Sequence, residues 1–453
     1  MAINIINPAT KSVYKSIEET DSAGLNAAVE NAKSAFEIWR KTSAAERTQA
    51  MHRVADEIEA CGAELAEIIV SEQGKPMAIA QMEVGGAAGW TRYNAELSLE
   101  PVVIEDSAER YVEEQRLPVG VVASITPWNW PLMIAVWHIM PALRAGCSVV
   151  IKPASTTPIN TIKLAEIINK HTVPNLVQVV VGGGRAVGEP LVKHPDVKKL
   201  VFTGSTPVGK HLAQIAVADL KKVTLELGGN DAGIVLENAD ISKIAEKIYM
   251  TSFINMGQTC ACLKRLYVHR SKYEALSNAL TEIAAAQVVG NGMDEGVTFG
   301  PVQNEKQFNS VNAMIEEAKA AGAEVIQPSL PTGLNGYFIA PTLIKDPKHD
   351  MSVVCEEQFG PVLPIIPYDN LEEVMSHAIH KEFALGGSVW GEECPERDWV
   401  VEQLDSGTVW INNHAEVLPH IPFGGNKDSG MGVEFGQEGL LEYTVRKVVN
   451  RAK

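Results

Sequence analysis

Two cysteines lie in a short run of small and polar residues, Gly257-Gln258-Thr259-Cys260-Ala261-Cys262. A partly apolar run with helical spacing, starting near Ile241, precedes them, and a strand-like segment, Lys264–His269, follows. A thiol at such a boundary can act as a nucleophile, because nearby backbone N–H groups can point at the atom that becomes negative during attack. A small buried cysteine is the plainer alternative, since free cysteine packs as a modest hydrophobe.

A carboxylate and an amide stand at the ends of two other predicted strands. Leu225-Glu226-Leu227-Gly228-Gly229 sets Glu226 between leucines, an apolar setting that raises the pKa of a carboxyl and makes it a usable general base. Thr126-Pro127-Trp128-Asn129-Trp130-Pro131 carries Asn129, whose amide can donate to an oxyanion. Taken alone, Glu226 is more often a surface charge and Asn129 more often a capping residue in an aromatic turn.

A glycine turn, Phe202-Thr203-Gly204-Ser205-Thr206-Pro207-Val208-Gly209, follows a predicted strand and opens a predicted helix. This context suits a phosphate or pyrophosphate at a helix N-terminus, with the Ser205 hydroxyl as an extra donor. A plain strand-to-helix turn with an N-cap serine is the alternative. The chain contains no GxGxxG and no GxxxxGK[ST] motif, so the turn alone does not identify a nucleotide site.

Alternating strands and helices from Val119 onwards predict a parallel, doubly wound sheet. Its predicted strands are Val121–Ile125, Ser148–Ile151, Val177–Val181, Lys199–Phe202 and Thr224–Leu227. The helices predicted between them are Pro131–Arg144, Ile159–Lys170, Arg185–Lys193 and Pro207–Ala218. A second α/β series follows Gly229, with strands near Lys264–His269, Glu324–Ile326, Gly386–Val389 and Val409–Asn412. We therefore expect an α/β protein with a Rossmann-like, parallel-sheet cofactor domain and a second α/β catalytic domain.

The remaining segments are helical at the N-terminus and extended elsewhere. Helical periodicity predicts Ser22–Lys41, Ala44–Gln73 and Pro76–Leu99. The extended stretches 100–118 and Glu442–Val449 would each leave an unpaired edge that invites pairing within or between subunits. We expect residues 1–99 and 119–228 to form the cofactor-binding domain and 229–428 the catalytic domain. Residues 100–118 and 429–453 would then form a β oligomerisation arm and C-terminal extension.

Composition bounds the class of protein. The chain has 453 residues, of which 45% are hydrophobic and 21% charged, as in soluble globular proteins with more than one domain. A formal net charge of −17 disfavours a nucleic-acid partner. Six sparse cysteines fit reduced thiols better than a disulfide framework. Without a run of membrane-spanning length or a signal-peptide pattern, we expect no membrane association and a cytoplasmic location.

The motifs together resemble those of the aldehyde dehydrogenase superfamily, whose members oxidise aldehydes with a nicotinamide cofactor. The resemblance covers almost the whole chain, and agreement of all its segments by chance is negligible. It rests on segments that recur in order: Asn129, Val150-Ile151-Lys152-Pro153, Phe202-Thr203-Gly204-Ser205-Thr206, Glu226-Leu227-Gly228-Gly229, Gly257-Gln258-Thr259-Cys260, Glu357-Gln358-Phe359-Gly360-Pro361 and Pro422-Phe423-Gly424-Gly425-Asn426-Lys427-Asp428-Ser429-Gly430.

The resemblance implies roles for particular residues. Cys260 would be the nucleophile, Asn129 with the backbone N–H of Cys260 the oxyanion hole, and Glu226 the general base. Cys262 would be a neighbour, and no metal is implied. The residues implied to contact NAD or NADP are Thr126, Pro127, Trp128, Lys152, Ser155, Gly188, Gly204, Ser205, Leu227, Glu357 and Phe359.

Within that set, the resemblance assigns Lys152 to the adenosine ribose and Ser205 to the pyrophosphate. It assigns Glu357 and Phe359 to the nicotinamide ribose and ring. Ser155 stands where NAD-preferring members often carry Glu, whose charge repels a 2′-phosphate. Because Ser beside a lysine can accept that phosphate, we expect NADP to be tolerated as well as NAD.

The implied chemistry is oxidation of an aldehyde to a carboxylic acid. The thiolate attacks the aldehyde to form a thiohemiacetal, hydride passes to the nicotinamide, and water activated by the glutamate releases the acid from a thioester. Three alternatives to aldehyde oxidation fit the residues less well. Acyl transfer to coenzyme A is disfavoured because Glu226 is present, a cofactor-free thioester hydrolase would leave Lys152 and Glu357 without a role, and a non-catalytic protein would not need every chemical position intact.

Substrate choice would come from segments that line the family's access channel. Candidate substrate residues are Trp130, Met133, Trp137, Ile254, Thr259 and Val417. These segments hold no Arg or Lys, and burying a substrate carboxylate without a cation would be costly. The chain thus resembles succinate-semialdehyde and betaine-aldehyde types without their substrate-anchoring residues. We expect a neutral, medium-sized aliphatic or aromatic aldehyde as substrate and a homodimer or homotetramer as the assembly.

Overall fold

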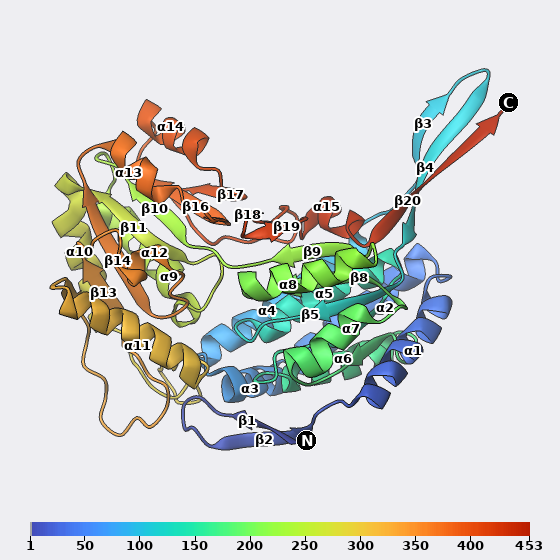
Figure 1. The fold of residues 1–453 in the computed structure, drawn as a ribbon, viewed down its shortest axis with the longest axis horizontal. Helices are drawn as coiled ribbons and strands as arrows, with labels where there is room; N and C mark the ends of the chain where they lie inside the picture. The colour runs from blue at the N-terminus through green and yellow to red at the C-terminus, as the bar shows by residue number, and fades with distance from the viewer. Residues whose placement is uncertain (1) are drawn as a thin grey trace.

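The computed structural model describes residues 2–453 (Figure 1). They include two helix-covered, mostly parallel sheets, an N-terminal hairpin and a projecting three-stranded ribbon. The α/β class expected from the sequence is confirmed. No helix among these residues is long and apolar enough to cross a membrane.

The first sheet has six strands in the order β19-β9-β8-β5-β6-β7. Its parallel strands are β5 (Val121–Ile125), β6 (Ser148–Lys152), β7 (Val177–Val179), β8 (Val197–Thr203) and β9 (Lys222–Glu226). Its helices are α5 (Pro131–Ala145), α6 (Ile159–His171), the π-helix η1 (Gly184–Gly188), α7 (Glu189–Lys193) and α8 (Thr206–Ala218). The chain runs from β5 outward to β7, then returns to place β8 on the other side. The strand order therefore reverses between β5 and β8, and ligands bind at such switch points beyond the carboxyl ends of the strands.

The N-terminal helices lie on both sides of this sheet. They are α1 (Ser22–Trp39), α2 (Ala44–Ala60), α3 (Gly62–Gln73) and α4 (Met77–Glu96), preceded by the hairpin β1 (Ala2–Ile6) and β2 (Val13–Glu18). The first packs directly on β5 and β6, on the face that α7 also covers, and the other three pack over α5 and α6 on the opposite face. The single helix predicted over Ala44–Gln73 is wrong, because the chain leaves helical geometry at Cys61 and starts again at Gly62. Apolar residues of α2, α3 and α4 share one buried cluster with α5 and β6, so the helices that precede the sheet help to fix α5.

The second sheet has seven strands in the order β12-β13-β14-β11-β10-β16-β17. Its strands are β10 (Asp231–Val235), β11 (Leu263–His269), β12 (Glu324–Ile326), β13 (Thr342–Lys345), β14 (Val362–Tyr368), β16 (Gly386–Trp390) and β17 (Thr408–Ile411). Around it lie α9 (Ile241–Phe253), the 3₁₀ turn η2 (Ile254–Gly257), α10 (Arg270–Ala285), α11 (Glu305–Ala320), α12 (Ser352–Cys355), α13 (Leu371–Ala378) and α14 (Pro395–Gln403). The sequence analysis missed β10, β13 and β14. Strand β14 contains Pro364 and Pro367, which argue against a central strand when only the sequence is known.

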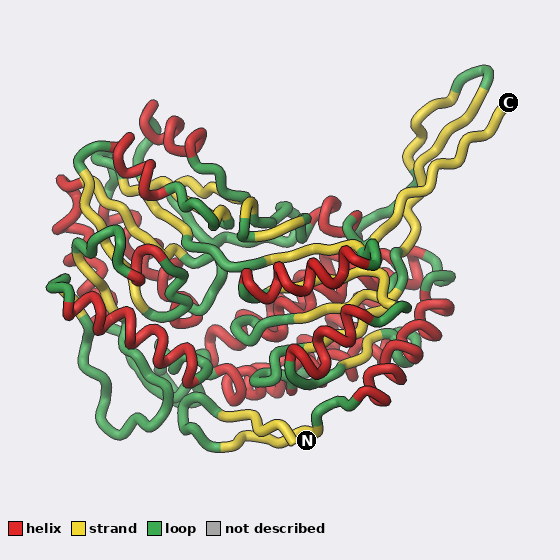
Figure 2. The backbone as a smooth tube through the Cα atoms, in the orientation of Figure 1, coloured by secondary structure: helices red, strands yellow, loops and turns green. Residues whose placement is uncertain are grey.

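The projecting ribbon joins two distant parts of the chain (Figure 2). It consists of β3 (Val102–Asp106), β4 (Arg110–Pro118) and β20 (Thr444–Ala452), with β20 antiparallel to β4 from Thr444↔Pro118 to Ala452↔Arg110. The predicted extended segments are therefore confirmed, and they pair with each other. Just before β20 come α15 (Gly436–Leu441) and the short strand β19 (Gly430–Met431), which pairs with β9 of the first sheet. A two-residue pairing links β15 (Phe383–Ala384) to β18 (Asn426–Lys427).

Candidate active site

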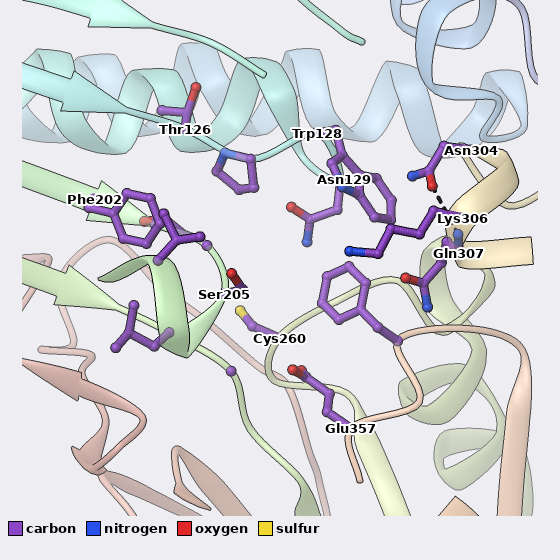
Figure 3. A pocket seen from close by; sticks show the side chains of 17 residues that line it. Thr126, Trp128, Asn129, Phe202, Ser205, Cys260, Asn304, Lys306, Gln307 and Glu357 are labelled. Atoms are coloured by element: carbon purple, nitrogen blue, oxygen red, sulfur yellow. Dashed lines mark hydrogen bonds between the residues drawn. The ribbon is translucent and has the colours of Figure 1, made fainter. Parts of the chain in front are cut away.

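A cavity of about 430 Å³ lies at the switch point of the first sheet, where the second sheet's loops close over it (Figure 3). The loops that follow β5 and β8 form one side, and the loop before β11 brings Cys260 to the other. The lining residues are Thr126, Pro127, Trp128, Asn129, Phe202, Thr203, Gly204, Ser205, Val208, Leu227, Gly228, Cys260, Asn304, Lys306, Gln307, Glu357 and Phe359.

The turn that carries Cys260 depends on left-handed backbone geometry. Helix α9 ends at Phe253, and Asn255, Met256 and Gly257 then take φ values of 51°, 55° and 70°. A Cβ atom on Gly257 would lie 2.2 Å from the carbonyl oxygen of Gly360, so only glycine fits there. The reversal sets Cys260 at the cavity instead of extending the helix past it.

The two cysteines have different surroundings. Cys260 is partly buried and lines the cavity, whereas Cys262 is buried in the protein interior. Burial, and then the negative charge of Glu226, raise the pKa of the Cys260 thiol, against which Lys264 acts in the opposite direction. The resting side chain is thus a thiol, and forming its thiolate requires a nearby proton acceptor.

Asn129 is held at the cavity by contacts to both of its ends. Its side-chain Nδ2 donates to the carbonyl oxygen of Gln258 at 2.9 Å, which leaves the second N–H of the amide for another acceptor. Its main-chain oxygen accepts from Asn255 Nδ2 at 2.8 Å and from Lys75 Nζ at 2.9 Å. The Asn129 amide is therefore fixed relative to the cysteine turn, because Gln258 lies two residues before Cys260.

Glu226 ends β9 and is almost fully buried. Neither of its carboxylate oxygens has a hydrogen-bond partner among residues 2–453. Burial, and then the charge of Glu434, raise the pKa of Glu226 well above its ordinary value. Glu434 is therefore a second carboxylate near Glu226. It is in turn paired with an imidazole, because His138 Nε2 lies 3.2 Å from Glu434 Oε1. A carboxyl with a raised pKa and no partner is suited to accept and release a proton.

A second cavity, of about 400 Å³, continues past α8. It is lined by Ile125, Lys152, Gly184, Arg185, Gly188, Glu189, Val208, His211 and Leu212. Val208 borders both cavities, so together they flank the first turn of α8. The N-cap residue Ser205 makes no side-chain hydrogen bond to that turn. The backbone N–H groups of the first turn of α8 are therefore free to bind an anion. An elongated dinucleotide fits this arrangement, with its phosphates at the helix start and its two ends in the two cavities.

Comparison with known proteins agrees with this geometry. The sequence model of the aldehyde dehydrogenase family matches residues 1–449. The chain is 38% identical to a phenylacetaldehyde dehydrogenase of Pseudomonas fluorescens, over 98% of this chain and 91% of that protein. It also superimposes on a Bacillus cereus aldehyde dehydrogenase solved as an NAD⁺ complex, with 35% identity, a TM-score of 0.95 and coverage of 100% and 93%. An NADP-dependent enzyme of E. coli matches with 34% identity, a TM-score of 0.96 and coverage of 100% and 95%.

The chain belongs to the aldehyde dehydrogenase family. It is an NAD(P)-dependent oxidoreductase that acts on aldehydes, as the sequence motifs predicted.

In the aldehyde dehydrogenase, all of the predicted cofactor residues except Ser155 line one of the two cavities. Lys152 and Gly188 line the second cavity and the others line the first. Ser155 lines neither of them, and its hydroxyl donates to the carbonyl oxygen of Gly182 at 2.9 Å. Arg185, which the sequence analysis missed, lines the second cavity beside Lys152. No motif marks Arg185, because it lies in a π-helical turn whose geometry the sequence does not reveal.

The predicted substrate residues of this aldehyde dehydrogenase divide into three groups. Trp137 and Val417 pack against the same buried apolar cluster as Cys260. Trp130 and Thr259 instead bond to each other, Nε1 to Oγ1 at 2.8 Å, beneath the cysteine turn. Met133 and Ile254 are partly buried and line neither of the two cavities described above.

Aromatic residues that the sequence analysis missed complete the apolar cluster beside Cys260. Phe435 lies 4.8 Å from Trp137 between ring centroids, and Trp90 lies 6.0 Å from each of them. The other members are Ala261, Leu385, Trp410 and Phe423. Asn304, Lys306 and Gln307, at the start of α11, were likewise missed, because nothing in a helix start predicts which cavity it borders.

Proposed function

We propose that this aldehyde dehydrogenase converts a neutral aldehyde into its carboxylic acid through a thioester on Cys260. The observation that supports the proposal is the approach of three groups from three separate elements: two of them line the first cavity, and the third is buried directly before the lining residues Leu227 and Gly228, where its charge acts on Cys260. They are the thiol of Cys260 before β11, the spare amide N–H of Asn129 after β5, and the unpartnered carboxylate of Glu226 at the end of β9.

The proposed sequence begins with a proton transfer. Glu226 takes the thiol proton of Cys260, which its raised pKa favours, and the thiolate forms a bond to the aldehyde carbon. The spare N–H of Asn129 and the backbone N–H of Cys260 stabilise the resulting oxyanion. Bound NAD(P) supplies the hydride acceptor for the oxidation. Glu226 releases the thiol proton to solvent before hydrolysis. It then takes a proton from the water that attacks the thioester, and the acid leaves as the C–S bond breaks and the Cys260 thiolate re-forms.

The cofactor site supports acceptance of both nucleotides. Lys152 and Arg185 both border the second cavity, and either can pair with a 2′-phosphate. Glu189 also borders the second cavity. Its carboxylate oxygens lie 3.4 Å from Lys193 Nζ and 3.1 Å from His211 Nε2. The similar proteins include one named as an NAD⁺ complex and one named as NADP-dependent. We propose that the chain uses NADP as well as NAD.

The apolar cluster beside Cys260 supports a neutral aldehyde with an aromatic group. Its members carry no charge to pair with a substrate carboxylate, and aromatic rings favour edge or offset contacts with one another. A similar protein is named a phenylacetaldehyde dehydrogenase. We propose an arylalkyl or medium aliphatic aldehyde as substrate.

The proposal also extends to organisation and assembly. Residues 1–99 and 119–228 form the cofactor domain and 229–428 the catalytic domain. Residues 100–118 and 429–453 supply the arm through which a homodimer or homotetramer forms.

One experiment tests the function. A panel of neutral aromatic, neutral aliphatic and anionic aldehydes is assayed with NAD and with NADP by the absorbance of the reduced cofactor, using wild type and Glu226→Gln. We expect acid formation from neutral aldehydes with either cofactor. From Glu226→Gln we expect a burst of reduced cofactor that is slower than in wild type, because the thiol must lose its proton without the carboxylate, followed by a stall at the thioester. An NAD preference of tenfold or more in kcat/KM, about 1.4 kcal/mol, would contradict the dual cofactor use. Steady turnover by Glu226→Gln at the wild-type rate would contradict the role of the base.

A further inference from the structure

A lysine and a glutamate form an ion pair in the interior behind the candidate oxyanion hole. Lys75 Nζ lies 2.5 Å from Glu83 Oε2, and both side chains are fully buried. Burial lowers the pKa of Lys75 to about 8, and the charge of Glu83 opposes that shift. Replacing such a pair with apolar residues is often neutral or stabilising, so its presence is weak evidence for a role in stability.

The glutamate caps the helix that follows Asn129. Helix α5 begins after Trp130, which offers no side-chain cap, and Pro131 has no N–H. The next two amides, of Leu132 and Met133, both donate to Glu83 Oε1 at 2.9 and 3.1 Å. The first turn of α5 is thus held by a carboxylate from α4, in place of the usual residue at its own N-terminus.

The lysine contacts the two residues just before that helix. Lys75 Nζ donates to the main-chain oxygen of Asn129 at 2.9 Å and lies 3.7 Å from the ring centroid of Trp130. Trp130 in turn donates from Nε1 to Thr259 Oγ1 at 2.8 Å, directly before Cys260. The pair therefore braces the loop after β5 that carries the Asn129 amide and, through Trp130, the turn that carries the Cys260 N–H.

We propose that Lys75 and Glu83 are positioning residues for the oxyanion hole, setting the Asn129 amide and the Cys260 backbone N–H at a fixed separation. The inference rests on the proposed function for the identity of the oxyanion. Neither residue touches the substrate. Their effect falls on attack at a carbonyl carbon, where an oxyanion develops, and not on the reactivity of the thiol itself. A displacement of about 1 Å in the two N–H donors can lower the rate of such an attack about 10²-fold.

The test compares two reactions of the same thiol in the full-length protein. Acylation of Cys260 by p-nitrophenyl acetate passes through an oxyanion, whereas alkylation by iodoacetamide does not. The main variant is Lys75→Met/Glu83→Gln, which removes both charges and keeps an oxygen to cap α5. We expect acylation and aldehyde oxidation to fall about 10²-fold, with alkylation within about threefold of wild type. Should that variant not fold, Glu83→Asp keeps the charges and draws the carboxylate back from α5, and about a tenfold selective loss is expected.

Glu72→Gln is the matched control. Glu72 is also a fully buried glutamate that caps a helix from outside, accepting from the first amides of α6, Ile159 and Asn160, without touching Asn129. We expect Glu72→Gln to change the thermal unfolding temperature by about as much as the double variant does. It should alter the rates of Cys260 acylation and alkylation equally. Wild-type acylation in the folded double variant, an equal fall in both reactions, or a selective fall in Glu72→Gln would each overturn the inference. Absence of Cys260-dependent aldehyde oxidation in wild type would instead reject the proposed function.

Discussion

Cys260 and Cys262 stand two residues apart, and only their surroundings distinguish them. Cys260 borders the cavity, whereas Cys262 is buried in the protein interior. We expect Cys260→Ala to abolish aldehyde oxidation and Cys262→Ala to retain at least about a third of it, since losing a buried sulfur chiefly affects packing. Initial rates with saturating cofactor and aldehyde measure both. Full activity in Cys260→Ala would refute the covalent route.

The second carboxylate behind Glu226 predicts a pH effect with a definite sign. A general base must be deprotonated, so activity falls as the pH drops through the pKa of Glu226. Burial and the charge of Glu434 both raise that pKa. Glu434→Gln removes the like charge, and the pKa of Glu226 should fall. We expect the acidic limb of the kcat/KM profile to move to lower pH.

Glu438→Gln is the control for that shift, because Glu438 is exposed on the following short helix. Its profile should overlay that of wild type. An unmoved acidic limb in Glu434→Gln would mean that the limb reports another group.

Sequence alone predicts the identity of the candidate chemical groups better than their surroundings. Cys260, Glu226 and Asn129 stand in short motifs, each tied to a strand end, so their placement follows from the strand prediction. Arg185, Phe435 and Glu434 were missed because they approach from a π-helical turn and from a loop far along the chain. Such residues carry no local pattern, and only the three-dimensional path of the chain brings them to the site.

At the scale of elements, the turn between α9 and Cys260 is the most constrained. Gly257 combines a φ of 70° with a Cβ position that would clash with the Gly360 carbonyl oxygen. We expect Gly257→Ala to lower the free energy of unfolding by about 3 kcal/mol or more, combining about 1–2 kcal/mol of left-handed strain with the clash. Activity should also fall, because Gly360 adjoins Phe359 of the cavity. Urea unfolding and steady-state rates measure the two effects.

Gly322→Ala separates strain from clash. Gly322 has a φ of 85°, but nothing lies within 4 Å of where its Cβ would stand. We expect only the strain of about 1–2 kcal/mol and unchanged kinetics. Equal losses in the two variants would show that the Gly360 contact relaxes without consequence.

At the scale of the molecule, the ribbon exposes apolar side chains on its outer strand. Val102, Val103 and Ile104 are all more than half exposed, and β3 has a free edge. If subunits pair there, a buried charge would oppose association. We expect Val103→Lys to lower the oligomeric state seen by light scattering while leaving the circular dichroism spectrum unchanged. Val288→Lys, at a site that is also 52% exposed but outside the ribbon, should leave the assembly intact.

The overall architecture was largely predictable because strands and helices alternate with clear periodicity. Failures occur where local signals conflict with the fold. Prolines disguise β14, and the helical periodicity of Ala44–Gln73 conceals the break at Cys61. The pairing of β20 with β4 joins segments more than 300 residues apart, so only the presence of extended edges could be anticipated, and not their register.

The last segment of the chain supplies the outer strand of the first sheet and the third strand of the ribbon. During synthesis the N-terminal parts fold first, so a nascent chain carries open edges on β9 and β4 until residues 430–452 have left the ribosome. Those edges can capture another nascent chain instead. A truncation or a bulky tag at the C-terminus would therefore reduce the yield of folded protein on the ribosome before it affects any catalytic step.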